Sequence, residues 1–301
     1  MSKPLILVTA ATGKTGSAVV EQLLERGFPV RAMARRHDSR SERLEQLGAE
    51  VVLGDFLDLG SMGRAMQGVE RLYFCYPPQG AHLVDATAIA AIVARDAGVQ
   101  AVVNMSQITA RPDAPSALSR QHWQSEHVLD WADIGAVHVR PTFFAENLYM
   151  FGAQTIAAEG KLYLPYGDQQ HAPVTAADIA RVIVEILADP APHTGARYVL
   201  TGPRNMTIAE MAGVLSNELG RPVEYVNLPI DVWGDVLRGV PDMSESLVKH
   251  LQAVAQDHQD GVFNAVTDVV ERIGGQPAQS LAQYIRENLA HFGVQTVSTQ
   301  A

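Results

Sequence analysis

The chain is poor in cysteine and in basic residues. It has a single cysteine, Cys75, among 301 residues, which excludes a disulfide framework within the chain and favours a reducing compartment. It has 23 Lys and Arg against 33 Asp and Glu, for a formal net charge of −10. Because a chain of this charge does not attract nucleic acid phosphates in a general way, no nucleic acid partner is expected.

Long apolar runs and metal-ligand spacings are also missing. No run approaches the length that spans a bilayer, and residues 1–4 enter an apolar segment with no signal peptide before it. We therefore expect a cytoplasmic protein with no membrane partner. The scattered histidines show no metal spacing, so no metal site is predicted. Cys75 lies in an apolar run and is interpreted as a buried small side chain rather than as a reactive thiol.

The composition that remains, 47% apolar and 19% charged, is that of a soluble globular protein. In the first half, short apolar runs alternate with segments of helical periodicity. Runs that are apolar throughout predict a parallel sheet covered by helices on both faces, the doubly wound α/β arrangement of a Rossmann-type fold. The strands are expected at residues 5–8, 30–34, 51–53, 71–76, 101–105 and 136–139. The helices between them are expected at residues 17–26, 41–47, 61–67, 81–97 and 119–131.

The pattern changes after about residue 155. We expect a nucleotide-binding domain at residues 1–155 and a smaller, mostly helical C-terminal lobe at 156–301 that supplies the substrate side. The chain is expected to return to the first domain around residues 174–200. Further helices are predicted at residues 178–187, 208–219, 230–237, 244–255 and 280–292, with extended segments at 161–165, 172–175 and 198–200. The helical lobe offers contact faces for a homodimer.

A glycine-containing turn at residues 9–16 follows the first strand and opens the first helix. Phosphate binding needs a tight turn of this kind, in which backbone N–H groups and the helix N-terminus face the pyrophosphate. Gly13 lets the backbone approach the phosphate and Gly16 lets the helix pack closely on the strand. Ala10 takes the place of the usual first glycine, although alanine disfavours positive φ. A P-loop is excluded because Val8 stands where its first glycine is required. The predicted contacts are Thr9, Ala11, Thr12, Gly13, Lys14, Thr15 and Gly16.

The end of the second strand indicates which nucleotide binds. Sites for NAD place a carboxylate there, about 20 residues after the loop, to bond the ribose 2′-hydroxyl. Here the strand ends in Arg35 and Arg36, and Asp38 comes later. A guanidinium group pairs with a 2′-phosphate, so we predict NADP(H) as the cofactor, held by Arg35 with help from Arg36 and Lys14. The alternative is a solvated basic cluster on a surface turn.

Asp55 and Phe56 follow the third strand, where the adenine ring usually rests. Asp55 is a candidate to bond the adenine amine and Phe56 to pack on the ring. Either residue can instead serve the turn locally.

Six segments together resemble the NmrA-like branch of the atypical short-chain dehydrogenases/reductases, over roughly residues 4–292. They read VTAATGKTG, VRAMAR, GDFLD, YFCYPP, VVNMSQITA and VRPTFFAEN. The branch includes NADP-dependent quinone and dye reductases as well as redox sensors. The resemblance implies NADPH along the carboxyl ends of the strands. It places the nicotinamide near Tyr76, Pro77 and Pro78, Ser106, and the turn of Pro141, Thr142 and Phe143.

Ordinary short-chain dehydrogenases use a Tyr-x-x-x-Lys pair on the helix after the fifth strand, where the tyrosine protonates an alkoxide. Here His122 falls at the tyrosine position and Glu126 at the lysine position, and no tyrosine lies between Tyr76 and Tyr149. At spacing i, i+4, His122 is expected to face Glu126. The pair is either an acid oriented by a carboxylate or a helix-surface contact. Ser106 contacts the nicotinamide or substrate, or serves a turn.

A site without this pair suits acceptors that delocalise charge, such as quinones, azo groups or enones. We therefore expect an NADPH-dependent oxidoreductase acting on a conjugated small molecule. The alternatives are a non-catalytic NADP(H) sensor and a non-redox enzyme on the same fold. Candidate substrate contacts are Trp123, Phe144, Tyr149, Tyr166 and His171. With Tyr76 and Phe143, the aromatic residues among them would form a wall for a flat substrate, although each alone can be a core residue.

Overall fold

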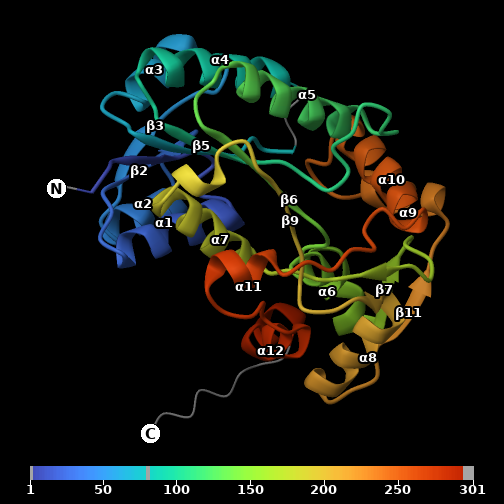
Figure 1. The fold of residues 1–301 in the computed structure, drawn as a ribbon. Helices are drawn as coiled ribbons and strands as arrows, with labels where there is room; N and C mark the ends of the chain where they lie inside the picture. Colours follow the sequence, from blue (N-terminus) through green and yellow to red (C-terminus); the bar gives the residue numbers. More distant parts are fainter. Residues whose placement is uncertain (1–2, 79–81, 294–301) are drawn as a thin grey trace, which may run out of the picture. The chain divides into compact units, whose positions relative to one another are not determined.

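The computed structural model describes residues 3–78 and 82–293. The chain divides into two compact units (Figure 1). The first unit comprises Met1–Arg140, Ala176–Val199 and Arg272–Gly275, and the second comprises Pro141–Thr175, Leu200–Glu271 and Gln276–Ala301. Among the helices of the described residues, none combines the length and hydropathy of a bilayer span.

A seven-stranded sheet forms the centre of the first unit. Pro141 and Leu200, the last residues of two of its strands, are counted with the second unit. The order of the strands is β3-β2-β1-β4-β5-β6-β9. The pairs β1–β2, β1–β4, β2–β3, β4–β5 and β5–β6 are parallel, which confirms the doubly wound α/β fold. The strands are β1 (Ile6–Val8), β2 (Val30–Ala34), β3 (Glu50–Leu53), β4 (Arg71–Phe74), β5 (Ala101–Met105), β6 (Ala136–Pro141) and β9 (Arg197–Leu200).

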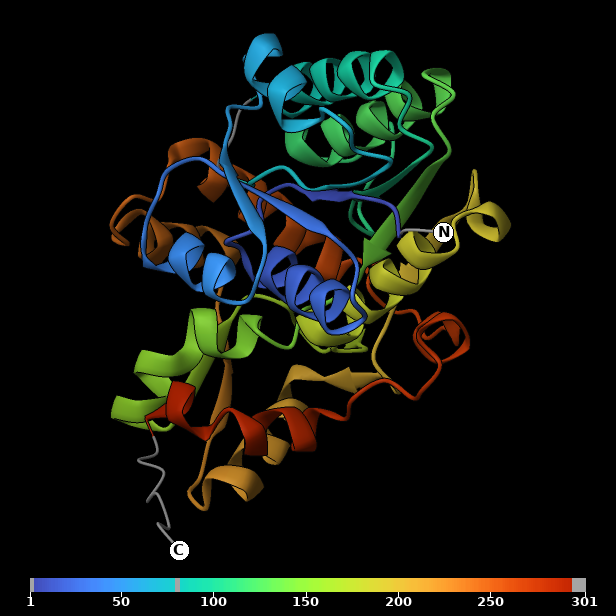
Figure 2. The ribbon, with the colours of Figure 1, turned by 90° about the vertical axis from the view of Figure 1, so that its left-hand side faces the viewer.

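Helices cover both faces of this sheet. Figures 1 and 2 show α1 and α2 on one side and α3, α4 and α5 on the other. Helix α1 packs on α7, and α4 packs on α3 and α5. The bounds are α1 (Lys14–Glu25), α2 (Ser39–Gln46), α3 (Leu59–Ala65), α4 (Leu83–Asp96), α5 (Ala117–Trp131) and α7 (Ala176–Ala188), with a short 3₁₀ helix η1 (Ala191–His193). Ala81, where the fourth helix was expected to begin, lies outside the described residues.

The core of the first unit follows the apolar runs of the sequence. Strand β1 is fully buried, and Val19, Val20 and Leu23 line the buried side of α1. On the other face, Leu72 and Phe74 of β4 pack in a cluster with side chains of α3, α4 and α5. Burying such side chains contributes about 1.5–3 kcal/mol each, so this packing fixes the sheet that carries the site.

The second unit contains two small sheets and several helices. Strand β7 pairs with β11 in parallel, and β8 pairs with β10 antiparallel. The elements are α6 (Asn147–Glu159), β7 (Lys161–Leu164), β8 (Gln170–His171), β10 (Met206–Thr207), α8 (Ile208–Leu219), β11 (Glu224–Asn227), α9 (Ile230–Arg238), α10 (Glu245–Gln259), α12 (Leu281–Glu287) and η2 (Leu289–Phe292). Helix α11 (Val269–Gly274) spans the division between the units. Residue 155, the expected domain boundary, lies inside α6.

Candidate nucleotide-binding and catalytic site

The turn between β1 and α1 has the features that an anion site requires. Helix α1 begins at Lys14, three residues earlier than expected. Gly13 is its N-cap, with no hydrogen bond from a capping side chain and no acidic residue in the first turn. The first N–H groups of a helix have no partner within the helix. The start of α1 therefore presents backbone donors and the positive end of the helix dipole.

Gly16 and Ala10 explain the tight shape of this turn. A Cβ atom on Gly16 would lie 2.3 Å from the Ala10 carbonyl oxygen, so only glycine fits there, as the packing argument predicts. A Cβ atom on Gly13 would lie 3.1 Å from the same oxygen. Ala10 itself adopts a φ of 46°, the left-handed conformation that the missing glycine would take at lower energy. This conformation costs an alanine about 1–2 kcal/mol, which the surrounding structure offsets.

The side chains of two threonines of the turn bond to strand β4 and to Cys75, which follows it. The Thr9 hydroxyl accepts from the Cys75 N–H at 2.8 Å and donates toward the carbonyl oxygens of Tyr73 and Cys75. The Tyr73 hydroxyl donates to Thr15 Oγ1 at 3.1 Å. The side chains of Thr9 and Thr15 therefore hold the turn in place. Of the other predicted contacts, Gly13 and Lys14 are exposed, Thr12 is half-buried, and Ala11 and Gly16 are buried.

The end of β2 carries exposed guanidinium groups, as expected. Arg35 and Arg36 are both exposed. In residues 3–78 and 82–293, Arg35 makes no ion pair, so its charge is available to a ligand. A third arginine, Arg40 of α2, shares a carboxylate partner with Arg36 and was missed by the sequence analysis. Asp38 pairs with Arg36 and Arg40 and lies at the start of α2.

The Asp55–Phe56 segment is partly committed to its own turn. Asp55 Oδ1 accepts from the Leu57 N–H at 2.9 Å, and the Asp55 N–H donates to Ser61 Oγ at 3.0 Å. Asp55 therefore stabilises its own turn, which is one of the two roles that the sequence analysis left open. Phe56 is half-buried and meets the rings of Phe74 and Tyr76 edge-on, at centroid distances of 5.9 and 5.2 Å.

Strand β4 ends at Phe74, two residues before the predicted end, so Cys75 and Tyr76 belong to the segment after it. Cys75 is half-buried rather than buried as predicted, and desolvation of its thiol raises the pKa to about 11, which keeps the thiol protonated. Tyr76 is half-buried, and burial raises its pKa. The predicted contact Pro77 is exposed.

Glu126 is the centre of a buried polar network. Its carboxylate is fully buried and accepts from the Ser106 hydroxyl at 2.5 Å. Arg140 of β6 donates two hydrogen bonds to it, at 2.8 and 2.5 Å, and Arg197 of β9 donates a third at 3.0 Å. Burial acts to raise the pKa of Glu126. The hydrogen bonds from Arg140 and Ser106 and the charge of Arg140 outweigh it, so the pKa lies below its usual range.

The network continues to the edge of the unit. Arg197 also donates to Asp130, and Asp130 accepts from the fully buried His138 Nε2 at 2.9 Å. Burial lowers the pKa of His138, which favours its neutral form. Two carboxylates and two guanidinium groups therefore balance one another across α5, β6 and β9.

This network shows where the Glu126 carboxylate points. It accepts hydrogen bonds from Ser106, Arg140 and Arg197, so it turns toward the sheet. The orientation of His122 by Glu126, expected from the i, i+4 spacing within α5, stays a prediction. Ser106 and Glu126 are brought together, as a donor and an ionised acceptor.

The candidate substrate contacts lie in different places. Phe143, Tyr166 and His171 gather in the second unit and are all buried, with edge-on or tilted ring contacts of 5.6 to 6.1 Å. His258, which the sequence analysis did not single out, joins this cluster and stacks on Tyr166 at 3.9 Å. These four rings form a buried core. A core position is the alternative role that the sequence analysis gave to each aromatic residue.

The remaining candidates are dispersed. Tyr149 stacks on His291 at 4.5 Å, and Phe144 forms a bridge with Val174. Pro141 is buried at the end of β6. In the first unit, Trp123 meets His127 edge-on at 4.5 Å, along α5.

The residues of the first unit fit a dinucleotide. The open start of α1 suits a pyrophosphate, and the clash of any Cβ at Gly16 keeps the turn tight enough to form it. The exposed Arg35 suits a 2′-phosphate. The described residues bring no three His, Cys, Asp or Glu side chains together in a way that would hold a metal ion.

Comparisons with known proteins agree with this geometry. The model of the NmrA-like family matches residues 2–286. The chain is 31% identical to an NAD(P)H azoreductase of Xenophilus azovorans, with 96% of this chain and 99% of the relative covered. It is 27% identical to quinone oxidoreductase 2 of Escherichia coli, over 93% and 97% of the two chains. Among solved structures, an NADPH-dependent quinone oxidoreductase from Escherichia coli, complexed with NADPH, superposes with a TM-score of 0.82 at 25% identity, over 94% and 99% of the two chains.

Proposed function

Because this chain belongs to the NmrA-like family, we propose that it is an NADPH-dependent oxidoreductase that transfers hydride to a conjugated small molecule of the quinone, azo or enone type. NADP(H) is its cofactor. The names of the relatives support a reductase of this general kind, since they include an NAD(P)H azoreductase and a quinone oxidoreductase. The narrower choice of acceptor rests on the chemistry around Ser106.

The observation that carries the proposal is the hydrogen bond from Ser106 to Glu126. A carboxylate held ionised by Arg140 and Arg197 has no proton to give and accepts only. The single hydroxyl hydrogen of Ser106 is used in the 2.5 Å bond to it. Neither residue can therefore protonate an alkoxide, and the lysine that would assist a tyrosine is replaced by a residue of opposite charge.

Simple ketones need such a proton donor, because reduction leaves a localised, basic oxyanion. Quinones, azo groups and enones spread the negative charge over a conjugated system and take a proton from water afterwards. For these acceptors the protein must position the reactants and exclude side reactions more than it must supply an acid. The absence of an acid at Ser106 and Glu126 thus favours conjugated acceptors.

The remaining residues act in binding. Bound NADPH supplies the hydride. The backbone N–H groups at the start of α1 bind its pyrophosphate, and Arg35 binds its 2′-phosphate. Ser106, with its hydrogen fixed on Glu126, offers oxygen lone pairs to a neighbouring donor. Arg140 and Arg197 keep Glu126 in place, so their role is positioning.

An assay of NADPH oxidation tests the proposal. The purified protein is mixed with NADPH and with a panel of quinones, azo dyes and enones, and absorbance at the dihydronicotinamide band is followed. Simple ketones of similar size serve as the comparison. We expect turnover with conjugated acceptors and none with the ketones. Tight NADPH binding without oxidation in any mixture, or faster oxidation with ketones than with quinones, would overturn the proposal.

A non-catalytic NADP(H) sensor is the second candidate, because the missing Tyr-Lys pair also suits a protein that binds the cofactor without turnover. It predicts that a partner protein binds with an affinity that follows the NADP⁺/NADPH ratio. A non-redox enzyme on the same fold predicts a product at the same oxidation level as the substrate, which product analysis by mass spectrometry detects.

A further inference from the structure

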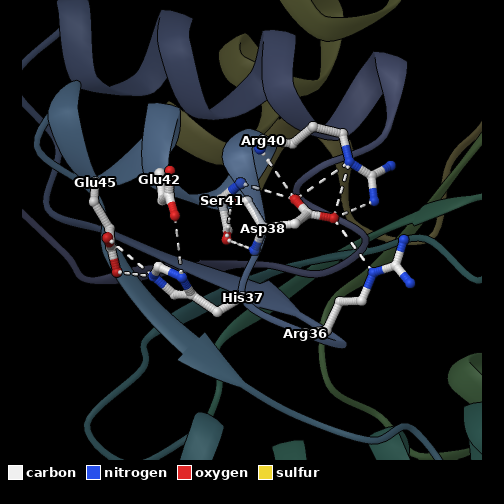
Figure 3. A network of polar contacts seen from close by, with 7 residues as sticks. All are labelled: Arg36, His37, Asp38, Arg40, Ser41, Glu42 and Glu45. Carbon is white, nitrogen blue, oxygen red and sulfur yellow. Dashed lines mark hydrogen bonds and ion pairs between the residues drawn. The ribbon is translucent and has the colours of Figure 1, made fainter.

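One carboxylate lies among the arginines that follow β2. Asp38 is the N-cap of α2, three residues after Arg35. Figure 3 shows its carboxylate between the side chains of Arg36 and Arg40. The sequence analysis set Asp38 aside because it lies beyond the end of the strand. In the structure, Asp38 nevertheless pairs with Arg36, next to the end of the strand, and with Arg40.

The two arginines are held unequally. Arg40 Nη2 lies 2.6 Å from Asp38 Oδ2, and its Nε reaches both carboxylate oxygens at 3.3 and 3.4 Å. Arg36 makes one longer contact through Nε, at 3.4 Å. Asp38 therefore binds Arg40 more tightly than Arg36, and Arg35 makes no ion pair in the described residues.

The carboxylate is fixed and the guanidinium groups are not. Asp38 Oδ1 accepts from the N–H groups of Arg40 and Ser41, and the Ser41 hydroxyl accepts from the Asp38 N–H, which completes a capping box. The side chains of Arg36 and Arg40 are 70% and 58% exposed, against 23% for Asp38. The arginines can thus turn toward an incoming anion, while Asp38 stays where it is.

The other charged side chains on and beside α2 make separate pairs. His37 lies 3.6 Å from Glu42 and 3.3 Å from Glu45, and in the described residues neither glutamate carboxylate pairs with Arg36 or Arg40. Arg43 pairs with Glu21 of α1 at 2.8 Å. These residues provide matched controls for changes at Asp38 and Arg40.

We infer that Asp38 is a specificity-determining residue, which competes with the 2′-phosphate of NADP(H) for Arg36 and Arg40 and so limits the preference for NADPH over NADH. The inference rests on the proposed function, in that it takes a dinucleotide to bind at the start of α1. A 2′-phosphate must draw Arg40 away from Asp38 and lie near a negative charge. A ribose 2′-hydroxyl meets no such repulsion and can donate to a carboxylate.

The decisive variant is Asp38→Asn. Asparagine caps a helix as well as aspartate, so α2 and the fold are retained while the charge is removed. We expect the Kd for NADPH to fall by roughly fivefold, the upper end of what one solvent-exposed ion pair contributes. The Kd for NADH is expected to stay the same or rise. Fluorescence titration measures both values, and calorimetry with 2′,5′-ADP and with 5′-AMP isolates the effect of the 2′-phosphate without any turnover.

Two further variants complete the design. Arg40→Ala removes the guanidinium group that Asp38 binds. It should weaken the binding of NADPH and 2′,5′-ADP by several-fold, with little change in the binding of NADH and 5′-AMP. Glu45→Gln and Arg43→Ala make the same changes of charge on the same helix, away from the cluster, and should leave the NADPH to NADH ratio within about twofold of the wild type.

The outcomes separate this inference from the proposed function. If the wild type binds NADPH and Asp38→Asn shifts both nucleotides equally, or no more than Glu45→Gln does, the role of Asp38 is refuted and the cofactor assignment stands. If the wild type binds neither nucleotide, both the role of Asp38 and the proposed function are refuted. If Asp38→Asn lowers the thermal midpoint by more than a few degrees, Arg40→Ala, which keeps the cap, decides: an unchanged NADPH to NADH ratio overturns the inference.

Discussion

Glu126 offers the sharpest test of how the first unit is held together. Replacement by glutamine keeps the size of the side chain and removes its charge. The carboxylate of the wild type is fully buried and accepts one hydrogen bond from Ser106 and three from two arginines. The amide of glutamine offers one acceptor oxygen and places an N–H donor against a guanidinium group. Arg140 and Arg197 then lose their shared counter-ion.

Removing one partner of a buried ion pair costs about 3–5 kcal/mol. The side chains of Arg140 and Arg197 are 20% and 34% exposed, and Arg197 keeps Asp130 as a partner. Water and Asp130 therefore compensate part of the loss, so we expect the lower end of the range, about 3 kcal/mol. The free energy of unfolding in urea, followed by tryptophan fluorescence, to which Trp123 and Trp131 of the same helix contribute, measures it.

The matched control is Glu185→Gln. Glu185 pairs with Arg26 in the same unit, and both side chains are about one-third exposed. An exposed pair is worth about 0–1 kcal/mol, so this variant should lose little stability. A loss below about 1 kcal/mol for Glu126→Gln, or an equal loss for both variants, would refute the account of Glu126 as a buried, charged hub.

The pH dependence of stability gives an independent test on the same residue. The pKa of Glu126 is lower in the folded chain than its unfolded value of 4.5. The unfolded chain therefore takes up a proton first as the pH falls. The stabilisation is complete above about pH 4.5 and is lost as the pH falls through the folded pKa. The Glu126→Gln variant should show a shallower loss of stability in that acid range than the wild type.

Four further predictions follow from the geometry. Gly16→Ala should abolish measurable NADPH binding and lower the thermal midpoint, because its Cβ would lie 2.3 Å from a backbone oxygen. Ala10→Gly should instead stabilise the chain by roughly 0.5–1 kcal/mol, and a lower midpoint would contradict the strain assigned to its φ of 46°. Burial lowers the pKa of His171 to about 4 and that of His258 well below its usual value, so both are neutral in the folded chain at a pH where the unfolded chain is protonated. The free energy of unfolding should therefore fall as the pH drops from about 6.5 toward 4. His258→Phe should make this fall shallower in urea titrations at several pH values. Cys75, with a thiol pKa of about 11, should react with iodoacetamide at pH 8 far more slowly in the native chain than in urea, and equal rates would contradict its protection.

The fold was predictable from the sequence where the signal is local. Each strand of the first unit is an apolar run, and each run lies at or within two residues of the observed strand. The second unit was less predictable, because α6, β8, β10 and β11 are short or lack a clear apolar period. The expected final helix at residues 280–292 divides at Asn288, whose φ of −123° leaves the helical region.

The site was predictable only where one segment forms it. The turn at residues 9–16 and Arg35 are such segments. The partners of Glu126 were not predictable, because Arg197 lies 71 residues away and reaches it across the sheet. No periodicity connects two such positions. Arg40 was closer in sequence, but only the capping turn at Asp38 brings it back to the end of β2.

Asp38 and Glu126 show how burial decides what the same chemistry does. Each is a carboxylate held by two arginines, and in each the hydrogen bond from one of them, Arg40 or Arg140, lowers the pKa. At Asp38 the arginines are mostly exposed, so the pair adds little to folding and its groups can exchange partners with a ligand. At Glu126 the carboxylate is closed off from water, so exchange would leave a charge unpaired. Removal of the Asp38 charge should therefore change nucleotide preference with little effect on stability. Removal of the Glu126 charge should change stability first, and a variant set that reversed this order would show that burial does not separate the two roles.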